Sequence, residues 1–375
     1  MISILKSRFK NIARRILKSK LIMPLWVLYF ALCIKKFDRK QISRKSKIRV
    51  IALNHKRWTQ YLEALNKNSD IQILILPEKI QDILGTLFLY PLREKISYEN
   101  QWEIESIEYI NKFQEEYKTY LITFLKKLKN LIKIDCIISC TFYYRRDKAW
   151  EKASQFANIP YISIHKECMK DQIVIKKMIK RYLERRYSFS GSNIIVYNEN
   201  EKKCLIEGGV TKSKKIKVLG CMRMDKYFKE AKEIKPLYKH CITLFSFRPT
   251  IGGIEIKDDI GGFSKSNKNG AIDYFNSVHS TIALFAKNNP EIQVYIKTKW
   301  KENWIERIQN VINKELQMNL KDIKNLCITA DINSYELIKK SSIIIGANST
   351  CLIEAIIFKR LVIIPILAEM QNRYK

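Results

Sequence analysis

The stretch that decides the fold is "SSIIIGANSTCLIEAIIFKRLVIIP", residues 341–365, in which two apolar runs enclose a small polar cluster. Residues 342–347 read Ser-Ile-Ile-Ile-Gly-Ala, and such a run of consecutive apolar residues is typical of a strand buried on both faces of a parallel sheet. Residues 350–360 follow as a helix, and residues 361–366 form another short apolar run. This order predicts one βαβ unit of a doubly wound α/β sheet.

The polar cluster falls where such sheets bind ligands. Asn348, Ser349 and Thr350 lie at the carboxyl end of the strand and at the helix start, where backbone N–H groups and the helix dipole favour phosphate. Glu354 follows one turn later on the same face, as a single carboxylate among apolar residues. A capping box needs a spacing of three from the cap, which this carboxylate does not have. Two interpretations remain open, namely a bond to the ribose hydroxyls of a nucleotide or a bond to a structural partner.

The rest of the chain repeats the alternation of apolar strands and helices. The predicted strands of the first half are 48–53, 71–76, 134–140, 160–164, 193–197 and 216–220, and those of the second half are 241–247, 292–297, 326–330, 342–347 and 361–366. We therefore expect an α/β fold of two doubly wound, Rossmann-like domains that face a cleft. The predicted boundaries are 47–228 for the N-terminal domain, 229–240 for a linker and 241–375 for the C-terminal domain. Only 21 residues follow Glu354, so we expect the last domain to be truncated.

The N-terminal segment, residues 1–46, is basic and partly apolar. Residues 1–60 hold 17 Lys and Arg against one acid, Asp38, in a chain whose net charge is +32. Apolar residues at helical spacing in 1–20 precede the uncharged run 21–34, which is shorter than the roughly 20 residues of a spanning helix. We expect a basic amphipathic segment that places residues 1–40 on an anionic membrane surface. A buried core helix and a true span are the alternatives.

The cysteine and histidine content bears on metal binding and on the cellular compartment. The nine cysteines form no CxxC pair, and with only four histidines we expect no metal site. Unpaired thiols are typical of a reducing compartment. Together with the basic N-terminus they predict a peripheral location on the cytoplasmic face of the cell membrane.

Three stretches resemble glycosyltransferases of the GT-B fold that build bacterial surface polysaccharides, together with the related CDP-glycerol glycerophosphotransferases and UDP-N-acetylglucosamine 2-epimerases. In residues 341–365 the resemblance implies that Ser349 and Thr350 meet the diphosphate and that Glu354 meets the ribose. The turn "GCMRMD" is similar to the passage into the interdomain hinge, with Gly220, Arg223 and Asp225 at the matching positions. The stretch "IPYISIHKEC", residues 159–168, resembles a strand and loop of the N-terminal domain.

The positions at which this sequence differs from those families favour one of the possible reactions over the others. The glycerophosphotransferases carry a catalytic His-Pro after the strand equivalent to 292–297, where this chain reads "YIKTKW" with Lys297 and Lys299. A lysine pair neutralises a diphosphate leaving group without identifying the transferred unit. Glycosyl transfer is therefore favoured, and glycerophosphate transfer and nucleotide-sugar epimerisation are the alternatives.

The predicted reaction needs a base and cationic groups but no cofactor, since the nucleotide sugar is the donor substrate. His165 or Glu167, directly after strand 160–164, is the expected general base. Arg248, after strand 241–247, is expected to reach the phosphates, and Arg145, Arg146 and Asp147 to contact an acidic acceptor. The acceptor is a saccharide, either free or lipid-linked. A basic membrane- or nucleic-acid-binding protein without catalysis is the competing class, but no nucleic-acid signature accompanies the charge, so no nucleic-acid partner is expected.

Overall fold

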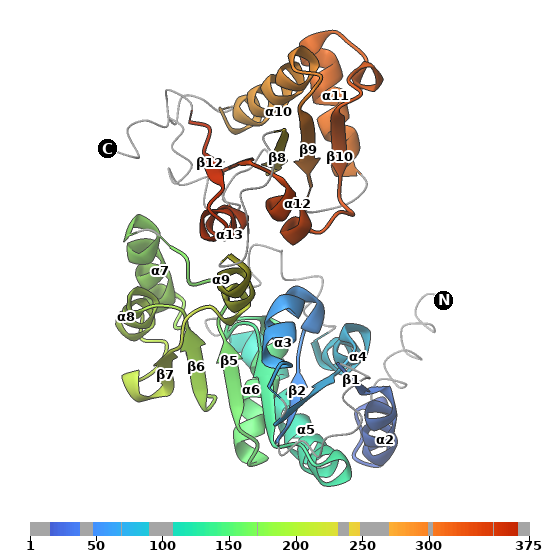
Figure 1. Cartoon of the computed structure of the whole chain (residues 1–375). Helices are drawn as coiled ribbons and strands as arrows, with labels where there is room; N and C mark the ends of the chain where they lie inside the picture. Colours follow the sequence, from blue (N-terminus) through green and yellow to red (C-terminus); the bar gives the residue numbers. More distant parts are fainter. Residues whose placement is uncertain are drawn as a thin grey trace. The chain divides into compact units, whose positions relative to one another are not determined.

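The computed structural model describes residues 16–37, 48–68, 70–89, 108–170, 172–231, 240–247, 270–298, 303–347 and 349–366. The chain divides into two compact units, Met1–Arg223 (unit 1) and Met224–Lys375 (unit 2) (Figure 1). Each unit contains one sheet with helices packed on it. The predicted fold class, α/β with two parallel sheets, is confirmed, whereas the predicted cleft between the domains stays a prediction.

Unit 1 contains a seven-stranded sheet in the order β1-β3-β2-β4-β5-β6-β7. Its strands are β1 (Lys35–Lys36), β2 (Ile48–Ala52), β3 (Ile71–Ile75), β4 (Cys136–Ser139), β5 (Tyr161–Ile164), β6 (Asn193–Val196) and β7 (Ile216–Val218). Strands β2 to β7 are parallel, and β1 joins the edge of β3 in the antiparallel sense. The central strand β4 is buried at every residue because both of its faces are covered, whereas Lys217 of the edge strand β7 is exposed.

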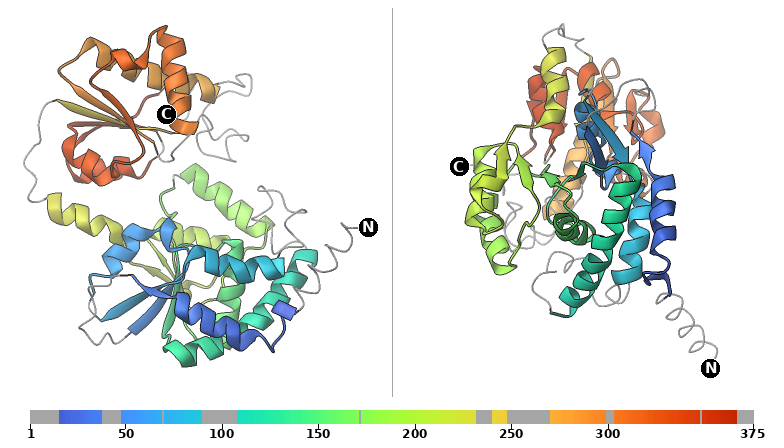
Figure 2. Two further views of the ribbon diagram at one scale, coloured as in Figure 1. Left: turned by 90° about the vertical axis from the view of Figure 1, so that its right-hand side faces the viewer. Right: turned by 90° about the horizontal axis from the view of Figure 1, so that it is seen from below.

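The helices of unit 1 form two layers on this sheet. They are α2 (Met23–Cys33), α3 (Thr59–Leu65), α4 (Glu78–Leu89), α5 (Glu108–Ile132), α6 (Arg145–Phe156), α7 (Gln172–Glu184) and α8 (Glu199–Glu207), with short 3-10 turns at His55–Arg57, Ser213–Lys215 and Met222–Met224. The larger core lies between the sheet and the layer that holds α4, α5 and α6, and α2 packs on α5 (Figure 2). A smaller core on the other face is closed by α3.

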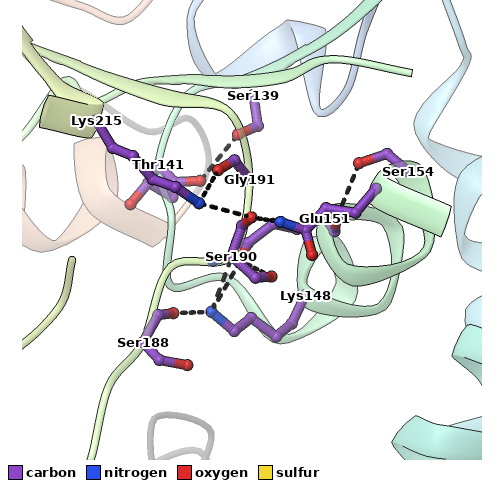
Figure 3. A network of polar contacts seen from close by, with 10 residues as sticks. Ser139, Thr141, Lys148, Glu151, Ser154, Ser188, Ser190, Gly191 and Lys215 are labelled. Carbon is purple, nitrogen blue, oxygen red and sulfur yellow. Dashed lines mark hydrogen bonds and ion pairs between the residues drawn. The ribbon is translucent and has the colours of Figure 1, made fainter. Parts of the chain in front are cut away.

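A buried polar network fixes the loop before β6 (Figure 3). Glu151 Oε1 accepts hydrogen bonds from the backbone N–H and the hydroxyl of Ser190, at 2.7 and 2.9 Å. Lys148 Nζ lies 3.2 Å from the same carboxylate oxygen and also donates to Ser188 O. Lys215 Nζ donates to Ser190 O and Gly191 O at 3.1 and 2.7 Å. The buried charges of Lys148 and Glu151 thus compensate each other while they hold this loop.

Unit 2 contains a five-stranded, fully parallel sheet in the order β10-β9-β8-β11-β12. The strands are β8 (Cys241–Phe245), β9 (Gln293–Lys297), β10 (Leu326–Thr329), β11 (Ile343–Gly346) and β12 (Leu361–Ile363). The helices are α9 (Asp225–Ala231), α10 (Gly270–Asn288), α11 (Asn303–Leu316), α12 (Ser334–Lys340) and α13 (Cys351–Ile357), with a 3-10 turn at Leu320–Asp322.

Helices cover both faces of this second sheet (Figure 2). Apolar residues of α10 and α11 form its main core with alternate residues of β8, β9 and β11. Helices α12 and α13 pack on the other face, and α9 packs on α13. The first residues of the predicted linker, up to Ala231, are helical, and residues 232–239 lie outside the described residues.

The apolar run at the N-terminus forms a short helix on the surface of unit 1. Helix α2 begins at Met23, directly before Pro24 in its first turn, and ends at Cys33. Residues 1–15 lie outside the described residues, so the predicted amphipathic pattern of 1–20 stays largely untested. Among the described residues, no helix combines the length and the apolar character needed to cross a bilayer.

Candidate functional site

The carboxyl edge of the unit 2 sheet brings four strand ends to one level. Gly346 of β11 pairs with Phe245 of β8, which pairs with Lys297 of β9, which in turn pairs with Thr329 of β10. The chain runs from β8 to β9 on one side and later returns to place β11 on the other side of β8. Ligands of open α/β sheets bind outside the carboxyl ends of the strands at such a reversal. The residues that leave β8 and β11 together therefore form the candidate site.

The turn from β11 into α13 carries two of the predicted phosphate-binding residues. Ser349 is half-buried and its Oγ accepts a hydrogen bond of 3.2 Å from the backbone N–H of Cys351. Thr350 is exposed and its side chain makes no capping bond. A Cβ on Gly346 would lie 3.1 Å from Leu352 Cδ2, so glycine permits the close approach of α13 to the strand. Asn348 lies outside the described residues.

Glu354 lies on the buried side of α13 and is 1% exposed. Its Oε2 accepts a hydrogen bond of 2.6 Å from the Tyr227 hydroxyl, which belongs to α9. The rings of Tyr227, Tyr335 and Phe358 pack against one another with centroids 5.1 to 5.7 Å apart. A structural partner thus exists for one carboxylate oxygen, which is the second of the two sequence interpretations. A carboxylate accepts several hydrogen bonds, so the ribose role remains compatible and stays a prediction.

Ser246 leaves β8 at the level of Ala347 and forms a pair that the sequence did not indicate. Its Oγ lies 2.9 Å from His279 Nε2, and His279 Nδ1 lies 2.6 Å from Phe275 O. A carbonyl can only accept, so Nδ1 carries the proton and Nε2 accepts the Ser246 hydroxyl proton. Burial lowers the pKa of His279 to about 4, which keeps the ring neutral. The Trp304 indole N–H lies 3.4 Å from the same Ser246 oxygen.

This pairing decides what Ser246 can offer a ligand. Its proton is committed to His279 and one lone pair faces the Trp304 N–H, so the half-buried oxygen keeps one lone pair for a ligand. Such an oxygen accepts from hydroxyl or N–H groups and does not donate to a phosphate. The pair joins residues 33 positions apart, and a single histidine in an apolar helix gives no sequence signal for it.

Lys297 is the described member of the predicted lysine pair, and it lies at the same edge. Its ammonium donates to Thr298 O and to Ala330 O, both at 2.8 Å, and so links the ends of β9 and β10. Its role at a diphosphate stays a prediction. Lys299 and Arg248, the other predicted cations, lie outside the described residues.

Arg223 ends unit 1 and is held there. Its Nη1 donates to Gln60 Oε1 at 3.0 Å, and its guanidinium carbon lies 5.6 Å from the centre of the Tyr61 ring. These contacts join the hinge-like turn to α3. They do not test its predicted role at the nucleotide.

The first candidate base, His165, is fully buried in unit 1. Its Nε2 lies 3.4 Å from Glu201 Oε1, and Lys170 Nζ lies 2.6 Å from the same oxygen. Burial lowers the pKa of His165, an effect that Glu201 opposes. Burial also acts to raise the pKa of Glu201, but His165 and Lys170 outweigh it, so this pKa lies below its ordinary value. The histidine therefore belongs to an internal charge cluster and has no exposed atom in this structure.

The second candidate base, Glu167, is exposed two residues further along. Its Oε2 accepts a hydrogen bond from the Tyr143 hydroxyl. Burial, and then the nearby Glu167 charge, raise the pKa of Tyr143 well above its ordinary value, so the phenol remains protonated and donates. A general base must reach the proton that it takes, and of the two residues only Glu167 is accessible to solvent. Neither assignment is tested by these contacts.

Asp147, one of the residues expected to contact the acceptor, is a buried structural link. It accepts two hydrogen bonds of 2.7 Å from Asn54 Nδ2 and one of 2.9 Å from Gln81 Nε2. Asn54 follows β2 in the left-handed region, with φ of 51°, and Asp147 lies in the first turn of α6, after β4. The link joins the two strand ends at the reversal point of the unit 1 sheet. The side chains of Arg145 and Arg146 lie outside the described part.

Comparison with known proteins gives matches among solved structures only. No protein-family model and no curated protein sequence matches the chain. A UDP-GlcNAc 2-epimerase from Neisseria meningitidis bound to UDP-GlcNAc has 14% identity and a TM-score of 0.45, over 84% of this chain and 81% of its own. HepE from Anabaena in complex with UDP-glucose has 9% identity and a TM-score of 0.43, over 84% and 80%.

A glycosyltransferase from Rickettsia africae has 14% identity and a TM-score of 0.42, over 85% of this chain and 79% of its own. The similar solved structures thus include UDP-GlcNAc 2-epimerases and a glycosyltransferase, two of the groups that the sequence resemblance named. The fold class itself rests on the strand order and register described above.

Proposed function

We propose that the chain is a glycosyltransferase that moves a sugar from a nucleotide sugar to a saccharide acceptor of a surface polysaccharide. The observation that carries this proposal is the polar edge of the unit 2 sheet. There Ser246 and the Ser349 turn leave neighbouring strands at the point where the strand order reverses, and the buried Glu354 follows one turn into α13.

The ligand chemistry proposed for this edge has two parts. Ser246, with its proton held by His279, accepts from a hydroxyl or an N–H, which a ribose, a sugar or a nucleobase supplies. Glu354, which accepts a hydrogen bond from Tyr227, also accepts hydrogen bonds from the ribose hydroxyls. Lys297, with Arg248 and Lys299 as predicted from the sequence, faces the negative charge of the diphosphate.

The chemistry proposed for unit 1 is proton removal from the acceptor hydroxyl. Glu167 is the better candidate base, because it is exposed whereas His165 lies inside the cluster with Glu201 and Lys170. Glu167→Gln is expected to lower kcat with little change in KM for the donor. His165→Gln is expected to act on stability instead.

Calorimetric titration of the full chain with UDP, CDP and GDP tests the proposal. One nucleotide is expected to bind, and Glu354→Gln is expected to weaken it about tenfold, because an amide oxygen replaces a charged acceptor. The amide still accepts from Tyr227, so the fold is retained. Tyr227→Phe is the matched control and should bind the nucleotide within about twofold of the parent. Equal affinity for all three nucleotides, or no binding in a folded chain, would refute the site.

Product analysis separates the alternatives within the same fold. The chain is incubated with nucleotide sugars that carry the nucleotide found to bind, with and without an acceptor extract. Release of the nucleoside diphosphate is expected only when the acceptor is present. Conversion of the donor sugar without acceptor would instead indicate epimerisation. Release of a nucleoside monophosphate would indicate glycerophosphate-type transfer.

A further inference from the structure

Helix α2 is apolar around its whole circumference, and within the described part of the chain only one of its faces is covered by other residues. It contains no charged residue between Met23 and Cys33. Met23, Val27 and Phe30, spaced by four and three residues, are at most 5% exposed. The Phe30 ring packs on Phe124 of α5 with centroids 4.9 Å apart. This face anchors the helix rigidly to unit 1.

The opposite face presents leucines to solvent. Leu25, Leu28 and Leu32 follow each other on the helix at spacings of three and four, and with Leu21 in the turn directly before the helix they form one stripe. Their exposed fractions are 88%, 65%, 51% and 76%. Surface helices of soluble proteins normally carry polar residues at such positions, and a contiguous exposed apolar patch marks an interaction surface. Figure 2 shows the helix at the outside of the helical layer.

Positive charge flanks this stripe at both ends. The exposed Lys20 precedes the helix, and the exposed Lys35 and Lys36 follow it. No acid occurs in residues 16–37. The Tyr29 side chain, which is 42% exposed, adds an aromatic ring of the kind that collects at lipid headgroups. An apolar stripe between lysines matches the acyl and headgroup layers of an anionic membrane.

The length of α2 determines how it lies. Eleven residues span about 16 Å as a helix, against a hydrocarbon core of about 30 Å. A helix this short that is held along α5 cannot cross the bilayer.

We propose that the stripe Leu21, Leu25, Leu28 and Leu32 docks unit 1 onto an anionic lipid bilayer, with α2 in the plane of the interface. The covered face fixes unit 1 to the membrane surface as a rigid body, and the exposed face enters the headgroup boundary. If the proposed glycosyl transfer holds, this placement favours a lipid-linked acceptor over a free one.

Vesicle sedimentation of the full chain tests this docking. The chain is expected to bind vesicles of 70% phosphatidylcholine and 30% phosphatidylglycerol, and to bind pure phosphatidylcholine at least tenfold more weakly. The variant Leu25→Ser/Leu28→Ser/Leu32→Ser should lose affinity by about 1,000-fold, because burial of each of the three leucines contributes about a factor of ten. Lys35→Gln/Lys36→Gln should lose about fivefold per lysine on the anionic vesicles only.

The matched control removes three exposed leucines elsewhere in unit 1. Leu131, Leu183 and Leu219 are 53%, 55% and 69% exposed, and their replacement by serine should leave vesicle binding unchanged. Circular dichroism checks that all variants remain folded. Undiminished vesicle binding by the α2 variant would overturn the proposal. So would a parent chain that binds no vesicles but forms a dimer that the α2 substitutions dissociate, since the stripe would then be a contact between copies.

This experiment does not depend on the nucleotide site. Vesicle binding with no nucleotide binding would retain the docking surface and reject the proposed function. Nucleotide binding without vesicle binding would retain the proposed nucleotide site and reject the docking surface.

Discussion

The hydrogen bond between Tyr227 and Glu354 is expected to hold α9 and α13 together, and Tyr227→Phe measures its strength. The carboxylate is 1% exposed and the bond is 2.6 Å long, so solvent cannot replace the lost hydroxyl. A hydrogen bond to a charged group contributes about 1.5–3 kcal/mol, and the phenyl ring keeps the packing with Tyr335 and Phe358. At about 2–4 °C per kcal/mol for a unit of this size, the midpoint of unit 2 should fall by about 3–12 °C.

The neighbouring Tyr335 supplies the control for this measurement. Its ring lies in the same aromatic cluster, but its hydroxyl has no hydrogen-bond partner within the described residues. Tyr335→Phe should therefore leave the unfolding free energy within about 0.5 kcal/mol or raise it slightly. Differential scanning calorimetry and urea unfolding of both variants provide the comparison. Equal destabilisation by the two substitutions would refute the reasoning, because the loss would then not depend on the hydrogen bond to Glu354.

Three further predictions concern other polar groups. Ser246→Ala should weaken nucleotide-sugar binding about fivefold in calorimetry through loss of one acceptor, whereas Ser280→Ala on α10, whose Oγ donates to Asn276 O at 2.8 Å, should not change it. Burial lowers the pKa of His279 from 6.5 to about 4, so the stability that the neutral ring contributes is complete above pH 6.5 and is lost as the pH falls towards 4. In urea titrations the free energy of unfolding of unit 2 should fall by about 3 kcal/mol over this range. His279→Gln should remove this dependence of stability on pH. Glu151→Ala should lower the free energy of unfolding by about 3–5 kcal/mol, because Lys148 stays buried without its carboxylate. Adding Lys148→Met to this variant should restore much of the lost stability. A double variant no more stable than Glu151→Ala alone would contradict this account.

The strands could be predicted because the signal for each one lies within a few consecutive residues of the sequence. The central parallel strands, such as β4 and β11, are covered on both faces and appear in the sequence as short apolar runs, and the structure places strands at all the predicted runs. Strand β1 was not predicted, since Lys35 and Lys36 carry no apolar signal and pair only at the edge of β3. Helix α9 was also missed in part, because "KEAKEIKP" reads as a linker although its first residues continue the helix from Asp225.

The partners within the candidate site were not predictable, because they come from distant parts of the chain. Glu354 was identified as an unusual carboxylate, but its partner Tyr227 lies 127 residues earlier and carries no mark in the sequence. Similarly, the position of His165 after a strand suggested catalysis, whereas its burial beside Glu201 depends on where α8 packs. The spacing of strands and helices along the chain predicts which residues lie at the edge of a sheet. Which of those side chains bond to other residues of the protein depends on the packing of distant elements.

The strand order of the two sheets has a consequence for how the protein folds during synthesis. In unit 2, β8 emerges first and lies in the centre, so that β9 and β10 add on one side and β11 and β12 add on the other. In unit 1, β2 has the same central place, and each later strand again joins an open edge. No strand must be inserted between two that are already paired. Each sheet can therefore grow outward as the ribosome delivers it, and unit 1 can finish before most of unit 2 exists.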